Sequence, residues 1–341
     1  MRHAALFVVF LCVINCAVFA SGPAGYGPAK HITVGGDGGW DYLTFDSGNH
    51  RVFITRATRV MVVDPDSGKS VGEIPDTPGI HGVALVADLG RGFTSNGRES
   101  MVTIFDLKTL KAISKVKTGD GPDAIVYDPK SRRVFTFNAH GQSATAIDAA
   151  EGKPVGDVPL GGKPEFAAPD GKGRMYVNIE DKNELAVIDT EKLAVTAHWP
   201  LPGCEEPSGL ALDREHRRLF SGCGNKVMLV VNADTGKVIT TLPIGQGVDA
   251  TAFDAGTQLA FASNGDGTLT VVHEDGPDKY SVVGNVETAR GARTMALDPD
   301  THTVYLVTAK FGPKPQPTAE NPRGRPPILP GTFELIVVPK Q

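Results

Sequence analysis

One position that recurs about every 40 residues along this chain is occupied by charged or polar residues. Their types suggest what chemistry the chain could support. One set is predicted to lie at the start of successive short strands: Asp41, His81, Asp123, Glu165, Ser208, Asp249 and Arg293. A purely structural turn could use the same residue type at every position, so this variety needs an explanation. We interpret it as the sign of a binding site for a polar ligand.

Loops that follow the next strand of each repeat contribute a second polar set. If both sets face one opening, the predicted ligand-binding residues are Asp41, His81, Arg98, Asp123, His140, Glu165, Glu206, Asp249, Arg293 and Lys310. The alternative is that these residues only fix turns, as Asp and Asn do in many β proteins. The expected partner is a small anionic molecule, a peptide or a protein bound at this face.

The same residues also allow a different class of function, a metal-assisted hydrolase of the lactonase kind. Carboxylate and amide oxygens suit Ca²⁺, and Glu165, Asn178 and Asp249 are the ligands that this alternative would use. The chain has no phosphate-binding loop, His-Glu-x-x-His, Gly-x-Ser-x-Gly or catalytic-cysteine motif. No catalytic residue is therefore identified, no cofactor is predicted, and a non-catalytic binding protein is favoured.

A repeated aromatic residue indicates which elements position these side chains. It occurs at intervals of 40, 42, 41, 44, 41 and 44 residues, at Phe53, Phe93, Phe135, Tyr176, Phe220, Phe261 and Tyr305. Each repeat has the pattern of four short strands, which in the third repeat are predicted over 123–127, 133–137, 143–147 and 153–159. A period of about 40 residues with four strands is typical of a β-propeller blade. We therefore predict an all-β domain over residues 30–341 that forms a seven-bladed β-propeller with four-stranded blades.

The two ends of the chain are predicted to share one blade. The seventh repeat ends after its third strand, predicted over 333–338, and has no fourth strand. Residues 30–35, Lys-His-Ile-Thr-Val-Gly, match the fourth-strand segment 241–245 of the fifth repeat. The N-terminal strand is therefore expected to complete the last blade, which would leave no open edge in the ring.

In these strands and turns the chain resembles the bacterial secreted seven-bladed propellers built from YVTN-type repeats, the YncE-like group. The resemblance is carried by segments 133–138, 183–190, 234–238 and 263–272, and it covers roughly residues 30 to 341. The literal Tyr-Val-Thr-Asn string is absent. The resemblance implies the propeller fold and a binding or surface role, and it says little about activity because its motifs are strand and turn residues.

Composition and charge exclude several other classes. The 40 Gly and 25 Pro make up 65 of 341 residues, about 19% against roughly 12% in average proteins, which indicates many turns and excludes a long helical bundle. With 40% hydrophobic residues the chain can bury a core and is not generally disordered. Its net charge of −5 gives no bulk attraction for nucleic acid, so no nucleic-acid partner is expected.

The first twenty residues are interpreted as a signal peptide. A basic start at Arg2 is followed by an almost unbroken apolar run over 4–18 and by the small-x-small pattern Val18-Phe19-Ala20. We expect cleavage after Ala20, a short linker over 21–29, and a secreted or periplasmic monomer without a membrane span. The alternative, a membrane anchor, would have a span at the lower limit of about 17 residues.

Two cysteines, Cys204 and Cys223, remain after such a cleavage. In an oxidising compartment an even number of thiols is expected to form a disulfide. A metal site is the alternative, but two cysteines without a nearby histidine are too few for structural zinc. Both residues are predicted to lie in loops on the same face of the fifth blade.

The seventh repeat carries an insertion over residues 311–331 that contains seven prolines. Prolines restrict the backbone, so this segment could form a semi-rigid lid over the channel that offers Arg323 and Arg325 to an anion. It could also bind a partner as a strap, or be a solvated loop.

Overall fold

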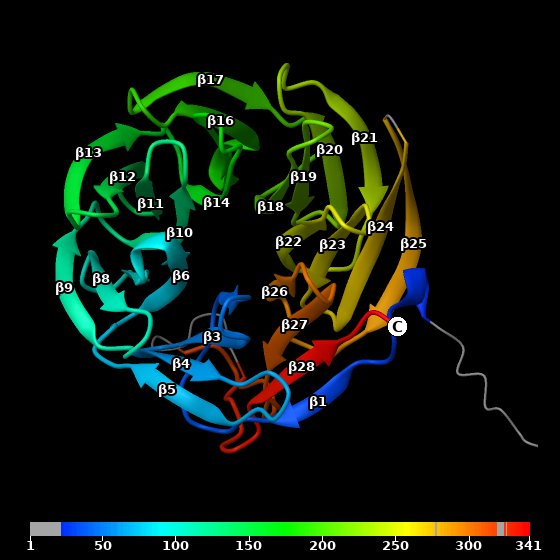
Figure 1. Cartoon of the computed structure of the whole chain (residues 1–341). Coiled ribbons are helices and arrows are strands. Elements are labelled where there is room, and N and C mark those ends of the chain that lie inside the picture. Colours follow the sequence, from blue (N-terminus) through cyan, green and yellow to red (C-terminus); the bar gives the residue numbers. More distant parts are fainter. Residues whose placement is uncertain (1–21, 277, 319–323, 325) are drawn as a thin grey trace, which may run out of the picture.

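Seven antiparallel four-stranded sheets surround a central opening (Figure 1), which confirms the predicted seven-bladed β-propeller. The computed structural model describes residues 22–276, 278–318, 324 and 326–341. The predicted signal peptide, its cleavage site after Ala20, and Arg323 and Arg325 lie outside the described residues. None of the helices in the described segments is long and apolar enough to cross a membrane.

The first four blades follow the chain, each running from an inner to an outer strand. Blade 1 contains β2 (Leu43–Asp46), β3 (Arg51–Arg56), β4 (Arg59–Val63) and β5 (Ser70–Ile74). Blade 2 contains β6 (Ile80–Val86), β7 (Arg91–Asn96), β8 (Met101–Asp106) and β9 (Ala112–Lys117). Blade 3 contains β10 (Pro122–Asp128), β11 (Arg133–Asn138), β12 (Ser143–Asp148) and β13 (Lys153–Pro159). Blade 4 contains β14 (Pro164–Pro169), β15 (Arg174–Ile179), β16 (Glu184–Asp189) and β17 (Ala194–Pro200).

The remaining blades keep this order until the ring closes. Blade 5 contains β18 (Pro207–Asp213), β19 (Arg218–Cys223), β20 (Val227–Asn232) and β21 (Val238–Pro243). Blade 6 contains β22 (Val248–Asp254), β23 (Leu259–Asn264), β24 (Thr268–Gly276) and β25 (Lys279–Glu287). Blade 7 contains β26 (Met295–Asp298), β27 (Thr303–Thr308), β28 (Glu334–Val338) and, as its outer strand, β1 (Lys30–Thr33). Short 3₁₀ turns are η1 (Pro23–Gly25), η2 (Ala87–Leu89) and η3 (Glu180–Lys182).

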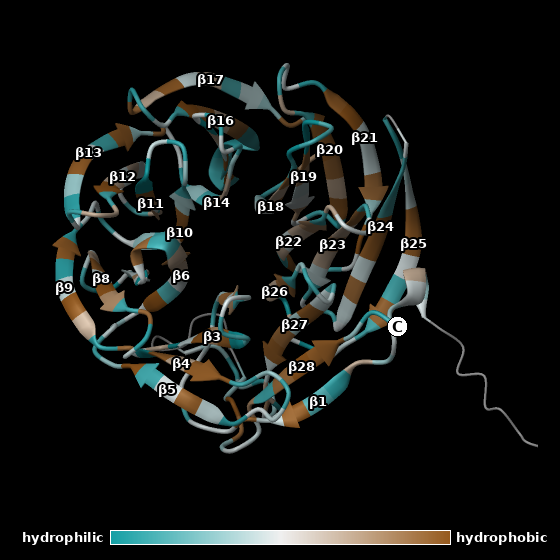
Figure 2. Ribbon diagram, in the orientation of Figure 1, coloured by the Kyte–Doolittle hydropathy of each residue, from teal (hydrophilic) through white to brown (hydrophobic). Residues whose placement is uncertain are grey.

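The core lies between neighbouring blades. The seven repeat aromatics are all buried and belong to hydrophobic clusters, as where Phe53 of blade 1 meets Phe105 of blade 2 with ring centroids 5.9 Å apart. Outer strands such as β17 alternate between exposed and half-buried residues, whereas the middle strands are buried nearly throughout. Figure 2 shows this difference as mixed colouring on the rim and brown strands further in. Outer strands bury only one face and therefore alternate, whereas middle strands bury both faces and are apolar nearly throughout.

The two ends of the chain lie side by side in blade 7 (Figure 1), which confirms the predicted closure. Lys30 pairs with Val337 and Thr33 with Glu334 in an antiparallel register. Residues 22–29, which we had assigned only to a linker, also pack on the ring. Tyr26 is fully buried against Phe261, and its hydroxyl donates a hydrogen bond to the carbonyl oxygen of His302 at 2.8 Å.

Candidate functional site

One cavity of about 960 Å³ opens where the inner strands begin, and all seven equivalent inner-strand residues line it. These residues come from seven different blades, so only the closed ring brings them together. Their order around the cavity is Asp41, His81, Asp123, Glu165, Ser208, Asp249 and Arg293. The fold thus converts a sequence repeat into a ring of unlike polar side chains.

Nine of the ten residues predicted to bind a ligand line this cavity. They are Asp41, His81, Arg98, Asp123, His140, Glu165, Glu206, Asp249 and Arg293. Lys310 is exposed and is not among the lining residues, because it begins the insertion of blade 7. There its backbone pairs with the other end of that insertion through Leu329 and Thr332.

His81 lies between two carboxylates on one side of the ring. Its Nδ1 is 2.6 Å from Asp41 Oδ2 and 3.4 Å from Asp123 Oδ1. The backbone holds this group in place, since the carbonyl oxygen of Asp41 accepts the Thr294 hydroxyl at 2.8 Å and the Tyr42 N–H donates to the His81 carbonyl oxygen at 3.1 Å. Burial alone would lower the pKa of His81, but the hydrogen bond to Asp41 and the charge of Asp123 raise it to about 9.

Two further ion pairs complete the ring. Lys163 pairs with Glu180 and lies 3.5 Å from Glu165 Oε2, while Arg293 Nε lies 3.0 Å from Asp249 Oδ2. Burial, together with the charge of Asp123, raises the pKa of Glu165 to about 8, and the charge of Lys163 opposes this rise only in part. Sequence analysis had not singled out Lys163. A lysine two residues before the inner-strand Glu165 was the signal that could have revealed it.

Two acceptor atoms in this ring have no hydrogen-bond donor. Asp123 Oδ1 and Glu165 Oε2 are buried and accept no hydrogen bond from any described residue. An unpaired buried acceptor typically costs about 1–3 kcal/mol, so such atoms are uncommon unless something else pairs with them. The ring therefore has unused capacity to accept hydrogen bonds from a ligand.

A smaller, more apolar groove of about 320 Å³ adjoins the cavity. Trp40, Phe311 and Ile328 line it, and Gly39, Trp40 and Arg293 border both spaces. Trp40 also packs on Phe333, with ring centroids 5.4 Å apart. Trp40 therefore packs against its own core and also lines the site.

The insertion of blade 7 forms one wall of this groove. Phe311 and Ile328 form an isolated antiparallel bridge, and the Gly312 N–H donates to the Pro327 carbonyl oxygen at 2.8 Å. The base of residues 311–331 is therefore tied together beside the cavity.

Arg56, the last residue of β3, is fully buried beneath the cavity. Its guanidinium lies 3.6 Å from the ring centroid of Phe333 and donates to the carbonyl oxygens of Gly36 and Gly38, each at 2.9 Å. Burial lowers its pKa to about 10. This arginine fixes the loop that presents Trp40 and Asp41, so its role is to position the site.

Asn178, a ligand in the calcium alternative, does not line the cavity. It lies on β15, fully buried, and its amide group donates to the Ser208 carbonyl oxygen at 2.8 Å, while its oxygen accepts the Ser221 hydroxyl at 3.1 Å. Glu165 and Asp249 face the cavity without it. The amide is used to join blades 4 and 5, which is why the predicted trio of oxygen ligands is not brought together.

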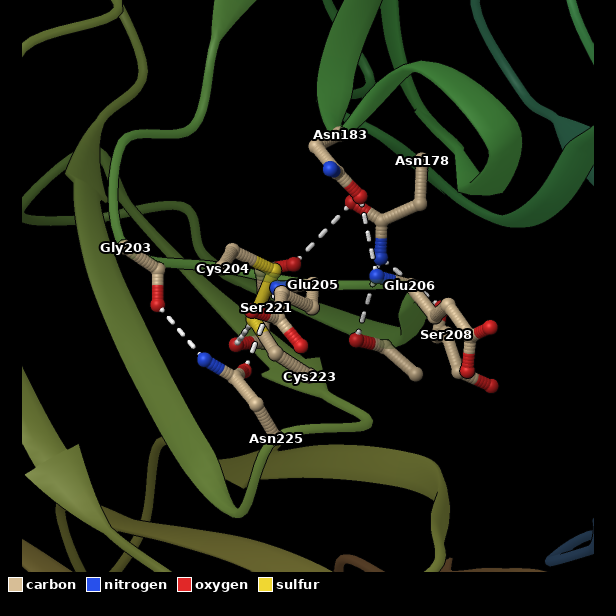
Figure 3. Close-up of a disulfide and its surroundings, with 11 residues drawn as sticks. Asn178, Asn183, Gly203, Cys204, Glu205, Glu206, Ser208, Ser221, Cys223 and Asn225 are labelled. Atoms are coloured by element: carbon tan, nitrogen blue, oxygen red, sulfur yellow. Dashed lines mark hydrogen bonds between the residues drawn. A yellow bond between two sulfur atoms is a disulfide. The ribbon is translucent and has the colours of Figure 1, made fainter.

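The predicted disulfide between Cys204 and Cys223 is present (Figure 3), with an S–S distance of 2.03 Å. It joins the loop before β18 to the end of β19. Next to it, the Glu206 N–H donates to Asn183 Oδ1 at 2.9 Å, and the Glu205 N–H donates to Asn225 Oδ1 at 3.1 Å. The bridge therefore stabilises the loop that carries Glu206 to the cavity rim.

Comparison with known proteins defines the class as a β-propeller. No family model and no curated protein matches the chain. A structure of U3-55K has a TM-score of 0.76 at 10% sequence identity. The WD40 repeats of RRP9 have a TM-score of 0.76 at 9% identity. Each of these alignments covers 92% of this chain and 98% of the compared chain. Hydrazine synthase of Kuenenia stuttgartiensis has a TM-score of 0.69 at 16% identity, over 79% of this chain and 92% of that chain. These likenesses show the fold alone.

Proposed function

We propose that this chain is a secreted or periplasmic binding protein whose central cavity holds a polar ligand that donates hydrogen bonds. The observation that carries this proposal is a pair of buried oxygens, Asp123 Oδ1 and Glu165 Oε2, that accept no hydrogen bond and have only long ion-pair contacts with His81 at 3.4 Å and Lys163 at 3.5 Å. A ligand N–H or O–H group placed there would offset the cost of burying them. The variety of side chains at seven equivalent positions supports the same interpretation.

The charges of the cavity favour a ligand that carries an ammonium group. Six carboxylates line it against three Lys or Arg and two His residues: Asp41, Asp123, Glu165, Glu180, Glu206 and Asp249; Arg98, Lys163 and Arg293; His81 and His140. The small anion that we expected from the sequence would meet this excess of carboxylates. The adjoining Trp40–Phe311 groove suits an apolar part of the same ligand.

Two finer assignments belong to this proposal. We propose that the chain is a divergent member of the YVTN-repeat, YncE-like propellers, on the strength of its repeat segments. We also propose that it is exported after cleavage at Ala20. The Cys204–Cys223 disulfide supports an oxidising compartment, in which such bonds persist.

A primary-amine probe tests the binding proposal. Titration calorimetry would compare a capped tripeptide that carries one lysine with its Nε-acetylated form at pH 9, above the pKa of about 8 at Glu165 and below the lysine pKa of about 10.4, so that the amine stays protonated. We expect binding of the unacetylated form only, and the Glu165→Gln variant should weaken it about tenfold, or roughly 1.4 kcal/mol. Glu151→Gln, an exposed carboxylate in the turn between β12 and β13, is the matched control and should leave the affinity unchanged.

Two results would count against this proposal. If neither peptide binds at millimolar concentration, the case for an ammonium ligand is removed. Equal affinity in the wild type and the Glu165→Gln variant would place the site elsewhere.

One observation favours a metal-assisted hydrolase as the second candidate function. Asp41, His81 and Asp123 each place a ligand atom within 4.8 Å of the others, and all three residues line the cavity. An imidazole with two carboxylates would suit Zn²⁺ or Mn²⁺, whereas the sequence had suggested Ca²⁺. Turnover of a lactone that is lost on chelation and in His81→Asn would favour this function over simple binding.

A further inference from the structure

A second cluster of ionisable groups lies at the other end of the inner strands, away from the cavity. Asp213 ends β18, and His216 lies in the following turn, both in blade 5, while Glu274 belongs to β24 of blade 6. Asp213 is five residues beyond the cavity-lining Ser208, roughly 17 Å along a strand that rises about 3.3 Å per residue. This cluster is therefore separate from the proposed ligand site.

The three side chains converge on a small volume. His216 Nδ1 lies 2.7 Å from Asp213 Oδ2 and 3.4 Å from Glu274 Oε1, and the three ligand atoms all lie within 4.8 Å of one another. The carboxylates are almost completely buried, with side-chain exposures of 1% for Asp213 and 3% for Glu274. His216, at 43%, remains open to solvent.

Glu274 provides the independent sign of a missing partner. Its Oε2 is buried and accepts no hydrogen bond, and its Oε1 has only long contacts of 3.4 Å with the Tyr280 hydroxyl and with His216 Nδ1. β24 has nine residues where β20 has six, and this extension carries Glu274 to the turn of blade 5. Two buried carboxylates thus face each other across a blade interface with one imidazole between them.

The interface between blades 6 and 7 shows what an ordinary histidine–aspartate pair looks like in this fold, since Asp254 ends β22 of blade 6 and His302 precedes β27 of blade 7. His302 Nδ1 lies 2.8 Å from Asp254 Oδ2, whose side chain is likewise buried. No third possible ligand lies near that pair, because the described residues contain only two groups of three converging metal ligands. One is the cluster of blades 5 and 6, and the other is Asp41, His81 and Asp123. The added Glu274 is therefore what distinguishes the cluster of blades 5 and 6.

We propose that Asp213, His216 and Glu274 form a binding site for a divalent cation of the Zn²⁺ or Co²⁺ class that joins blades 5 and 6. One imidazole nitrogen and two carboxylate oxygens at about 2.0–2.2 Å from a tetrahedral ion would be roughly 3.3–3.5 Å apart. The Nδ1–Oε1 distance of 3.4 Å already fits, and the Nδ1–Oδ2 distance of 2.7 Å must open by about 0.6 Å as the ion replaces their shared proton. Water from the exposed side of His216 would supply the fourth ligand.

Neighbouring charges leave the carboxylates available to a cation. Arg218 lies beside the turn and donates to the His216 carbonyl oxygen at 2.7 Å, but its guanidinium pairs with Asp278 at 2.7 Å. The ion would therefore offset the charge of two buried carboxylates that the described residues do not neutralise fully.

Cobalt titration of the full-length protein, after dialysis against a chelator, tests this site. We expect visible absorption bands of protein-bound Co²⁺ that saturate with the site and are removed by Zn²⁺. Glu274→Gln and His216→Asn should each lower the Co²⁺ affinity more than about 100-fold, because even residues that only support a metal ligand contribute 10–100-fold. His302→Asn is the matched control, since it removes a histidine that pairs with a buried aspartate at the next blade interface, and it should leave the affinity unchanged.

The melting temperature provides a second readout. Zn²⁺ that binds only the folded state raises the melting temperature. Added Zn²⁺ should therefore raise the melting temperatures of the wild type and of His302→Asn equally, and should leave that of His216→Asn unchanged. Because His216 is exposed, its variant is expected to fold even if Glu274→Gln does not. His81→Asn should keep the Co²⁺ bands, which separates this site from any metal in the cavity.

Three outcomes would overturn the proposal. These are no Co²⁺ bands in the wild type, bands that persist in both His216→Asn and Glu274→Gln, and bands that are lost in His81→Asn but kept in His216→Asn. The proposal stands apart from the amine-binding function, so either can fail without the other.

Discussion

The ionisable side chains around the cavity have been desolvated without being fully paired. Glu165 and Asp123 each have a buried oxygen that accepts no hydrogen bond, and His81 is held between two carboxylates. Burial disfavours the charged form of a carboxyl group, and it raises the pKa of Glu165 to about 8. The site is therefore expected to change its protonation near neutral pH.

We predict that the free energy of unfolding falls as the pH rises from 5 to 9. Glu165 binds its proton more tightly when folded, with a pKa of about 8 against 4.5, so its contribution is lost as the pH rises through about 8. His81, with a folded pKa of about 9 against 6.5, loses its contribution as the pH rises through about 9. Urea unfolding at several pH values should show a combined loss of several kcal/mol, since each unit of pKa difference corresponds to about 1.4 kcal/mol.

Glu165→Gln separates the two contributions. The variant should remove the part of the slope between about pH 5 and 8 and leave the part due to His81, while Glu151→Gln should keep the whole slope. Stability that is constant or that rises over this range would contradict the assignment of both residues.

At the scale of elements, the site depends on loops that are each fastened by a different device. Arg56 holds the loop before β2, the Phe311–Ile328 bridge closes the base of the blade 7 insertion, and the disulfide fixes the loop before β18. Loops on a rigid scaffold commonly carry function because they can vary without loss of the core. In this ring the loops vary while the strands keep their register.

We predict that removing the disulfide destabilises the protein and loosens the rim at Glu206. For a link that spans 19 residues, the loss of chain constraint corresponds to about 3 kcal/mol. The double variant Cys204→Ser/Cys223→Ser, studied by urea unfolding, should show this loss, and amide exchange should increase in residues 203–206. An unchanged free energy of unfolding, with unchanged exchange, would show that the hydrogen bonds of Asn183 and Asn225 hold the loop alone.

At the scale of the whole molecule, the ring is closed from both ends of the chain. β1 pairs with β28, and the preceding segment inserts Tyr26 between blades 6 and 7, where it contacts Phe261 and His302. Closure removes the free edges that an open array of blades would expose. The cavity also depends on closure, because Asp41 of the first blade lies next to Thr294 of the last.

We predict that Tyr26→Ala lowers the free energy of unfolding by about 3–5 kcal/mol, the range for large aromatic side chains removed from a core. Tyr26→Phe removes only the hydrogen bond to His302 and should cost about 1 kcal/mol. Thermal or urea unfolding measures both variants. A loss below about 1 kcal/mol in Tyr26→Ala would show that β1 closes the ring without this anchor.

The architecture could be predicted from the sequence because its signals are local and repeated. The aromatic at Phe53 and its six equivalents, the strand alternation and the turn residues each recur seven times, so errors in one blade do not propagate. The fourth strand of blade 7 was predicted for the same reason, since segment 30–35 matches the pattern of its equivalents. Even the residues of the polar ring could be predicted, because they occupy the same position in each repeat.

Side-chain direction and burial could not be predicted in this way. Asn178 was a candidate ligand of the calcium alternative, yet it is fully buried and joins blades 4 and 5. Arg56 is likewise buried, beneath the loop that it positions. Lys310 does not line the cavity, because an insertion interrupts the repeat at this point. The cluster of Asp213, His216 and Glu274 forms across a blade interface, and no spacing in the sequence indicates which residues meet there.

The sequence by itself therefore determined the number of blades, the closure of the ring, the disulfide and most of the residues around the channel. These follow from periodicity and from residue type, which act over a few neighbouring positions. Only the tertiary structure decided which carboxylates are desolvated and unpaired, because burial and electrostatic interactions depend on groups from separate blades. Those two properties make the cavity an acceptor of hydrogen bonds. The tertiary contacts between blades 5 and 6 also bring three possible metal ligands together outside the cavity, at the opposite end of the inner strands.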